Sequence, residues 1–314
     1  MKYALVFPGQ GSQEIGMGKE LFDAFPVAKS IFEEADDALK FNLTRLIFEG
    51  DEKELVLTQN SQPAILTVSI AALRVLTDEM NVNLKPECSA GHSLGEYTAL
   101  ISNGALSFWD GVKLVRERGR LMQEAIEPGK GAMAAILGLT PEQVYDVCKK
   151  VAPENECQPA NFNAPGQIVI SGLTEFIDKA IVEAKAQGAK RAIKLSVSAP
   201  FHSKFMISAA DKLKLEFKNS EWHKSNWPVV ANVSAKPVND DEIQDALYKQ
   251  TFSPVLWEDS VKFMANNLGV DTFFELGNGE VLAGLIKRIL KGANIFIKSA
   301  STPSKLEELA ECLR

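Results

Sequence analysis

The sequence is poor in the side chains that build metal centres and disulfide frameworks. It has four cysteines and three histidines in 314 residues, and no two cysteines form a Cys-x-x-Cys pair. Zinc knuckles and thioredoxin-like redox motifs therefore have no support, and we expect neither a metal nor a cofactor.

Long apolar runs are also missing. The most apolar stretch, residues 64–76, contains Arg74 and is about a dozen residues long, whereas a membrane span needs roughly 20. The apolar run at Tyr3–Phe7 is too short for a signal peptide, and no small-residue cleavage site follows it. We expect a cytoplasmic protein with no membrane partner.

Positive charge is in deficit, because the sequence has 34 Lys and Arg residues but 41 Asp and Glu residues, for a formal net charge of −7. This balance opposes nucleic acid as the main partner, and we expect none. A hydrophobic content of 46% and a charged content of 24% exclude long disorder, collagen and coiled coil. The length suits one large α/β domain, or one that carries a smaller insert.

The apolar patterns predict an α/β protein. The continuous apolar run Tyr3–Phe7 is typical of a strand covered on both faces in a parallel sheet. A helix over 61–80 is apolar nearly all round, with Pro63 in its first turn, and a helix over 107–126 begins with a capping box at Ser107. Further strands are expected at 87–91, 229–233, 272–276 and 295–297, with a helix over 280–290.

The middle of the chain has a pattern of strands and helices that differs from the rest. Strands at 132–137, 158–163, 167–171 and 191–197 and helices at 140–151 and 174–187 give the order βαββαβ, the ferredoxin-like split unit. We interpret residues 129–198 as a small ferredoxin-like domain inserted into a larger α/β core of residues 1–128 and 199–314.

The strongest chemical signal is Gly91-His92-Ser93-Leu94-Gly95, a Gly-x-Ser-x-Gly pattern between a predicted strand and a predicted helix. A serine on such a tight turn is exposed as a nucleophile, and the amide of Leu94 can bind an oxyanion at the helix N-terminus. The alternative is a glycine-rich turn with an incidental serine.

A serine nucleophile needs a base, and His202 and His223 are the candidates beyond the turn. His223 lies in a polar stretch, whereas His202 follows an apolar strand and the rigid pair Pro200-Phe201, so we favour His202 over a purely packing role. His92 is adjacent to Ser93 on the extended chain, and we assign it a structural role.

Helical spacing separates two arginines. The neighbours of Arg118 at three and four positions are all apolar, whereas those of Arg120 are all polar. Arg118 is thus expected to face the core or a cleft, paired either with a protein carboxylate or with a substrate carboxylate that its fork can bind in bidentate fashion. Gly119 predicts a close approach of another element at that point.

The N-terminal glycine-rich loop fits no nucleotide motif. Glu14 stands where the dinucleotide fingerprint needs a third small residue, and Gln13 stands where a P-loop needs its leading glycine. What remains is a turn after a strand, suited to a second oxyanion donor from the amide of Gln10.

Together these motifs resemble the malonyl-CoA:acyl-carrier-protein transacylases of bacterial fatty acid synthesis. The resemblance spans nearly the whole chain in the family's order, through residues 7–13, 62–64, 91–97, 118–123, 161–167, 199–203 and 250–257. Two turns depart from the family pattern: Ser253 stands where asparagine is common, and Asn278 where proline is common.

The resemblance implies an α/β-hydrolase-like core with an inserted ferredoxin-like subdomain, and transfer of malonyl from malonyl-CoA to acyl carrier protein. It implies that Ser93 is acylated and that His202 is its base, oriented by Gln250 or a nearby backbone carbonyl. It also implies an oxyanion hole from Gln10 and Leu94, and that Arg118 holds the malonyl carboxylate. Other residues that it places at the substrate are Gln62, Met122, Asn161, Asn163 and Phe201.

Two other functions remain open from the residues. A serine esterase or thioesterase would use the same turn and base with water as acceptor, and would not need Arg118. A non-catalytic module that binds acyl-CoA or carrier protein would show no turnover.

Overall fold

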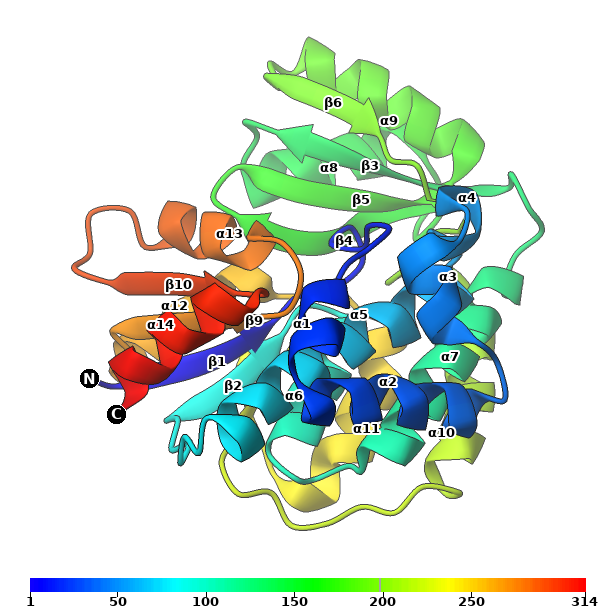
Figure 1. Ribbon diagram of the computed structural model, residues 1–314. Helices are drawn as coiled ribbons and strands as arrows, with labels where there is room; N and C mark the ends of the chain where they lie inside the picture. The colour runs from blue at the N-terminus through cyan, green and yellow to red at the C-terminus, as the bar shows by residue number, and fades with distance from the viewer. Residues whose placement is uncertain (198) are drawn as a thin grey trace.

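The computed structural model describes residues 1–197 and 199–314. Within these residues the strands form two sheets, one with six strands and one with four. Figure 1 shows the smaller sheet with its two helices at the top of the molecule, apart from the larger sheet below. Ser198, the end of the predicted insert, lies outside the described residues.

The larger sheet is parallel except at one edge. Its order is β10 (Phe296–Ala300), β9 (Thr272–Leu276), β1 (Tyr3–Phe7), β2 (Cys88–Gly91), β7 (Val229–Ala231) and β8 (Lys236–Val238), and β8 alone in this sheet pairs antiparallel. The strands at 3–7 and 272–276 were predicted with these bounds. β7 ends two residues before the expected 233, and β8 was not predicted.

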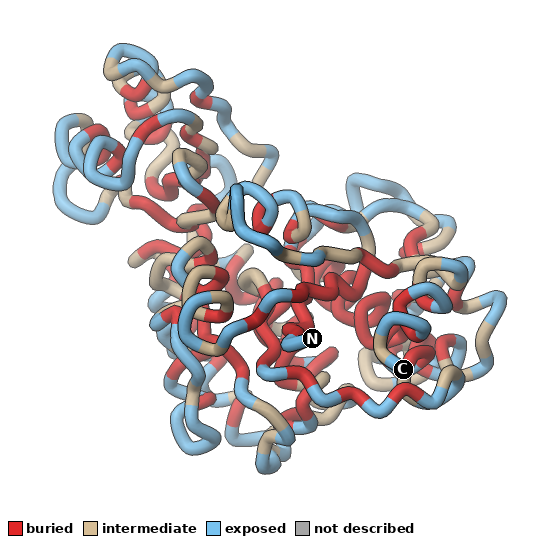
Figure 2. Tube along the Cα trace, turned by 90° about the vertical axis from the view of Figure 1, so that its left-hand side faces the viewer, coloured by how far each residue is buried: buried red, intermediate tan, exposed pale blue. Residues whose placement is uncertain are grey.

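Side chains of β1 alternate between two apolar clusters. Leu5 and Phe7 pack with the helices α2 (Pro26–Leu39), α5 (Thr58–Arg74), α6 (Leu94–Ser102), α7 (Phe108–Glu124) and α10 (Ile207–Phe217). Ala4 and Val6 pack with α12 (Trp257–Asn267) and α13 (Val281–Ile289) on the other face. This is the period of two expected for a strand covered on both faces, and Figure 2 shows the buried residues gathered inside the larger part.

The smaller sheet has a core of its own. Its order is β4 (Cys157–Ala164), β5 (Gln167–Leu173), β3 (Gly131–Leu137) and β6 (Arg191–Lys194), all antiparallel, with α8 (Pro141–Val151) and α9 (Thr174–Ala186) packed against it. Along the chain the order is β3-α8-β4-β5-α9-β6, as the sequence predicted, although β6 stops three residues short of 197. Strand β4 also pairs with the larger part, because the Phe162 amide donates to the Val255 carbonyl and the Val255 amide donates to Ala160.

The helix that contains Pro63 differs from its prediction. It begins at Thr58, so Pro63 lies inside it and not in the first turn, and it continues as a π-helix, η1 (Val75–Glu79). The expected burial is confirmed, since Ser61 to Leu73 are all buried. Gly119 of α7 lies against this helix, and a Cβ there would be only 2.5 Å from the Thr58 carbonyl oxygen. The close approach expected from Gly119 is therefore present.

The other described helices complete the outer layer. They are α1 (Lys19–Ala24), α3 (Leu43–Glu49), α4 (Glu52–Leu55), η2 (Lys204–Met206), η3 (Asp240–Glu242), α11 (Ile243–Phe252) and α14 (Pro303–Leu313). No described helix is long and apolar enough to cross a membrane.

Parallel strands place their following loops at one edge of the sheet. β1, β2 and β7 are neighbours, so the loops that begin at Pro8, His92 and Asn232 lie side by side. This edge is where the candidate site is built.

Candidate active site

Ser93 lies on a strained turn between β2 and α6. Its backbone has φ 53° and ψ −104°, and such a positive φ is one that non-glycine residues rarely adopt. A Cβ on Gly91 would be 1.9 Å from the Gly95 carbonyl oxygen, and one on Gly95 would be 2.1 Å from that of Phe7. Only glycine fits on either side, and the turn presents the Ser93 hydroxyl at the sheet edge.

His202 meets this hydroxyl from a distant segment. Its Nε2 lies 2.7 Å from Ser93 Oγ, and its Nδ1 lies 2.9 Å from the backbone carbonyl oxygen of Gln250. A carbonyl can only accept, so Nδ1 carries the proton and Nε2 is free to accept the serine proton. Of the two orienting groups that the sequence left open, the backbone carbonyl of Gln250 is the one in contact.

His202 is also strongly buried. It is 3% exposed, and its backbone has φ 56°. Burial, and next the positive charge of Arg118, lower the pKa of His202 from its ordinary value near 6.5 to about 3. The imidazole is therefore neutral, the form that a general base requires.

This lowered pKa gives a pH prediction. At saturating malonyl-CoA, the rate of Ser93 acylation should change little between about pH 8 and 5, because His202 stays neutral throughout this range. Single-turnover acylation measured by rapid quench checks this. With an ordinary pKa near 6.5 the rate would instead fall about eightfold from pH 7 to 5.5, which would contradict the structure.

The amides of Gln10 and Leu94 lie in the loops that follow β1 and β2. In the part of the chain that the structure describes, neither amide donates to another residue. The amide of Ser93, in contrast, donates to Asn232 Oδ1 at 2.7 Å. The two free N–H groups are thus available for an oxyanion beside Ser93.

Arg118 reaches the site from α7. Its side chain is 1% exposed, and its terminal nitrogens donate to Gln62 Oε1 at 2.7 Å, Ser93 Oγ at 3.1 Å and Gln250 Oε1 at 3.0 Å. These acceptors are all neutral, no ion pair to Arg118 is present among the described residues, and its Nε is buried without a partner. The guanidinium is held in place by neutral acceptors and forms no ion pair among the described residues, so it can bind an anionic guest.

These groups line a cavity of about 450 Å³ between the two sheets. Several sequence-predicted residues line it: Gln10, Gln62, Ser93, Arg118, Met122, Asn161, Phe201 and His202. Leu94 and Gln250 are buried and do not line the cavity; Gln250 contacts two lining residues, His202 through its backbone carbonyl and Arg118 through its side-chain oxygen. Asn163 does not line the cavity; its Oδ1 lies 2.8 Å from His92 Nε2, and His92 itself is part of the lining.

The comparisons with known proteins agree with this geometry. The acyl transferase domain model matches residues 4–301. The malonyl CoA-acyl carrier protein transacylase of Bacillus subtilis (strain 168) is 48% identical over 316 residues, which cover 100% of this chain and 98% of that protein. The chain belongs to the malonyl CoA-acyl carrier protein transacylase family. It is therefore an acyltransferase.

Other members of this transacylase family are similarly close. The Escherichia coli (strain K12) protein of that name is 44% identical over 290 residues, covering 92% of this chain and 93% of its own. The acyl-carrier-protein-S-malonyltransferase of Bartonella henselae has a TM-score of 0.96 at 43% identity, over 100% and 99% of the two chains. A malonyl-transacylase solved in complex with a type II PKS acyl-carrier protein has a TM-score of 0.95 at 42% identity, over 99% and 100%.

Sequence reasoning missed two residues in this transacylase. Asn232 binds the Ser93 amide through Oδ1 and donates from Nδ2 to the Gly91 carbonyl at 2.8 Å, so it fixes both ends of the turn. Glu96, fully buried in the first turn of α6, accepts from the Asn232 amide. A polar residue at the end of an apolar strand, and a carboxylate in an apolar helix, are the signals that could have found them.

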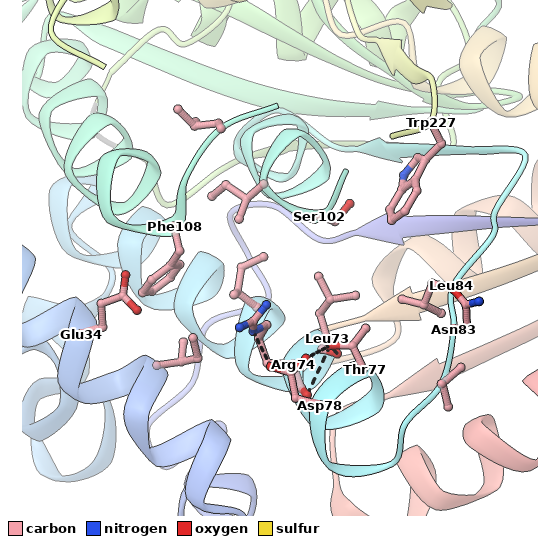
Figure 3. A pocket seen from close by; sticks show the side chains of 15 residues that line it. Glu34, Leu73, Arg74, Thr77, Asp78, Asn83, Leu84, Ser102, Phe108 and Trp227 are labelled. Carbon is pink, nitrogen blue, oxygen red and sulfur yellow. Dashed lines mark hydrogen bonds and ion pairs between the residues drawn. The ribbon is translucent and has the colours of Figure 1, made fainter. Parts of the chain in front are cut away.

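A second cavity of about 550 Å³ lies elsewhere in the transacylase, between α2, α5 and α6 (Figure 3). Arg74 and Asp78 form an ion pair at 3.0 Å on its wall. The hydroxyls of Thr77 and Ser102 donate to carbonyls of their own helices, and no histidine or cysteine lines it. It therefore lacks the nucleophile and base of the first cavity. No cluster of candidate metal ligands occurs among the described residues.

Proposed function

We propose that the protein transfers a malonyl group from malonyl-CoA to the phosphopantetheine thiol of acyl carrier protein, through an acyl-serine at Ser93. One observation carries this proposal. The Ser93 hydroxyl lies within hydrogen-bond distance of a neutral imidazole on one side and of an unpaired guanidinium on the other. The imidazole provides a base, and the guanidinium provides a counter-charge for the free carboxylate that distinguishes malonyl from acetyl.

In the first half-reaction, His202 Nε2 takes the Ser93 proton as Oγ attacks the thioester carbonyl carbon. The amides of Gln10 and Leu94 hold the oxyanion, a contribution of about 2.7–4 kcal/mol for one such donor in a comparable site. The carbon–sulfur bond then breaks, and the proton on His202 passes to the sulfur of CoA.

In the second half-reaction, the carrier thiol gives its proton to His202 and its sulfur attacks the acyl-serine. The bond from Ser93 Oγ to the acyl carbon breaks, and Oγ recovers the proton. Arg118 holds the malonyl carboxylate throughout, with Gln62, Met122, Asn161 and Phe201 around it. Asn163 acts one step away by positioning His92.

The relatives' names support the substrate and the acceptor, since they are malonyl CoA-acyl carrier protein transacylases. The solved complex of such an enzyme with an acyl-carrier protein supports the carrier as partner. An esterase or thioesterase explains the serine and histidine but not the buried Arg118. A non-catalytic binding module explains none of the three.

The experiment that tests the function is intact-mass analysis in two steps. Mixing with malonyl-CoA should add one malonyl group to the protein, and subsequent pantetheine should remove it and yield malonyl-pantetheine. Release as free malonate at the same rate without pantetheine would mean a thioesterase. No adduct at all would mean a binding module.

The finer architecture is also proposed. We infer an α/β-hydrolase-like core of residues 1–128 and 199–314 and a ferredoxin-like insert of residues 129–198, supported by the order β3-α8-β4-β5-α9-β6 and by a separate apolar cluster. We further infer that the protein works in the cytoplasm, without a cofactor, where malonyl-CoA and acyl carrier protein meet.

A further inference from the structure

One buried carboxylate lies behind the candidate site without touching the cavity. Glu96 is 1% exposed in the first turn of α6. A single oxygen, Oε2, accepts from the Asn232 amide at 2.9 Å and from Gln250 Nε2 at 3.0 Å. The proposed reaction uses no proton from this group and gives it no contact with substrate, so its burial needs another explanation.

Gln250 connects this carboxylate to Arg118. Its Nε2 donates to Glu96 and, at 2.8 Å, to the Ser93 carbonyl, while its Oε1 accepts from Arg118 at 3.0 Å. A glutamine side chain has a donor end and an acceptor end. The acceptors on the Glu96 side require the NH₂ end there, so the oxygen must face the guanidinium. With the amide reversed, NH₂ would face Arg118 and an oxygen would face the carboxylate.

Asn232 is held in a comparable way. Glu96 fixes its backbone amide, while its side chain binds the Ser93 amide and the Gly91 carbonyl. One carboxylate thus supports the residues that hold both the nucleophile and the guanidinium.

The arrangement also places negative charge near Arg118 without blocking it. A carboxylate in direct contact with the guanidinium would compete with an anionic guest for its nitrogens. Glu96 acts through Gln250 instead, and its charge raises the pKa of Arg118 against the effect of burial. Burial raises the pKa of Glu96, whereas the hydrogen bonds from Asn232 and Gln250 and the charge of Arg118 lower it. The net result is a pKa raised to about 7.

We propose that Glu96 is a positioning residue for recognition of the acyl carboxylate: it orients the Gln250 amide so that Arg118 faces the cavity, with a negative charge nearby but no direct ion pair. This inference rests on the proposed function. It predicts that Glu96 affects substrates that carry a carboxylate and spares those that do not.

The test variant is Glu96→Gln. Because both donors meet one oxygen, a glutamine carbonyl in its place can accept both hydrogen bonds, and only the charge is removed. We expect KM for malonyl-CoA to rise about tenfold, with kcat little changed. Single-turnover acylation by acetyl-CoA, which has no carboxylate, should stay within twofold of the unmodified protein.

The matched control is Glu275→Gln. Glu275 is also fully buried, but it accepts from the amides of Leu282 and Ala283 at the start of α13 and from Ser299 Oγ. If neutralising any buried carboxylate disturbed the fold enough to weaken malonyl binding, this variant would show the same selective rise in KM. We expect it to keep the malonyl-CoA KM.

The melting temperature of Glu96→Gln separates a positioning role from a structural role, because the two roles predict shifts in opposite directions. At pH 8 Glu96 is ionised in the folded and unfolded states, and its raised pKa means that folding disfavours this charge. Glu96→Gln should therefore melt at or above the temperature of the unmodified protein. A purely structural carboxylate would give a lower melting temperature and equal losses with both thioesters, which would overturn the proposal.

A second variant keeps the proposal testable if Glu96→Gln does not fold. Gln250→Leu interrupts the relay at its middle residue and leaves Glu96 in place, and it should also raise the KM for malonyl-CoA. Normal malonyl-CoA KM in either folded variant would refute the positioning role while leaving the transferase function intact. Absence of a malonyl adduct on the unmodified protein would refute that function instead.

Discussion

The Ser93→Ala variant is expected to take up no malonyl group from malonyl-CoA. The hydroxyl it lacks is the group that His202 Nε2 contacts at 2.7 Å, and no other side chain among the described residues is hydrogen-bonded to that nitrogen. We expect transfer to carrier protein to fall by at least about 10⁴-fold, the scale of nucleophile removal in serine enzymes. Intact-mass analysis after a malonyl-CoA pulse measures the adduct directly.

Ser102→Ala is the matched control for this result. Ser102 is the last residue of α6, the helix that follows Ser93, but it lines the second cavity (Figure 3), and its hydroxyl donates to the Ala99 carbonyl. This variant should be malonylated at the normal rate. A full adduct on Ser93→Ala would mean that the acyl group is carried elsewhere.

The Arg118→Ala variant is expected to lose malonyl transfer by about 100-fold or more, the cost of leaving a carboxylate without its guanidinium. Acylation by acetyl-CoA should fall much less, so the preference for malonyl over acetyl collapses. The ratio of kcat/KM for the two thioesters is the measurement. Equal losses would indicate that Arg118 holds the fold and does not select the acyl group.

The Arg118→Ala variant should also change the pKa of the base, His202. The Arg118 charge helps to lower the pKa of His202, so its removal should raise that pKa and move the acidic fall in acylation rate to higher pH. Arg120→Ala is the control, because Arg120 lies two residues away on the exposed side of α7 and pairs with Glu117 and Glu124. It should leave both the acyl preference and the pH profile unchanged.

Local patterns were enough to predict much of the fold. Short, largely apolar segments predicted β1 and β9 with their observed bounds, and turn residues separated the elements of the smaller sheet. Boundaries failed where tertiary contacts decide them. Pro63 suggested a helix start at residue 61, yet the helix begins three residues earlier at Thr58, where α5 meets Gly119 of α7. The short edge strand β8 has an exposed pattern with no apolar signal.

The site divides in the same way. Ser93 follows from its glycines, and Arg118 from its apolar neighbours at helical spacing, because both signals are local. The partners of these residues are not local: Gln250 and Asn232 are 132 and 139 positions from the groups they bind. No sequence spacing could show that the Gln250 carbonyl, and not its side chain, would meet His202.

The cavity is lined by residues from both parts of the molecule, and this has a consequence for how acyl-group specificity can change in such an enzyme. The turn at Ser93, the imidazole and the guanidinium all come from the larger part, whereas Met133, Asn161 and Leu195 come from the smaller one. The smaller part thus contributes to the shape of the cavity but supplies none of the groups proposed to make and break the ester. Replacements in the smaller part can reshape the room for an acyl group while the machinery that makes and breaks the ester stays untouched.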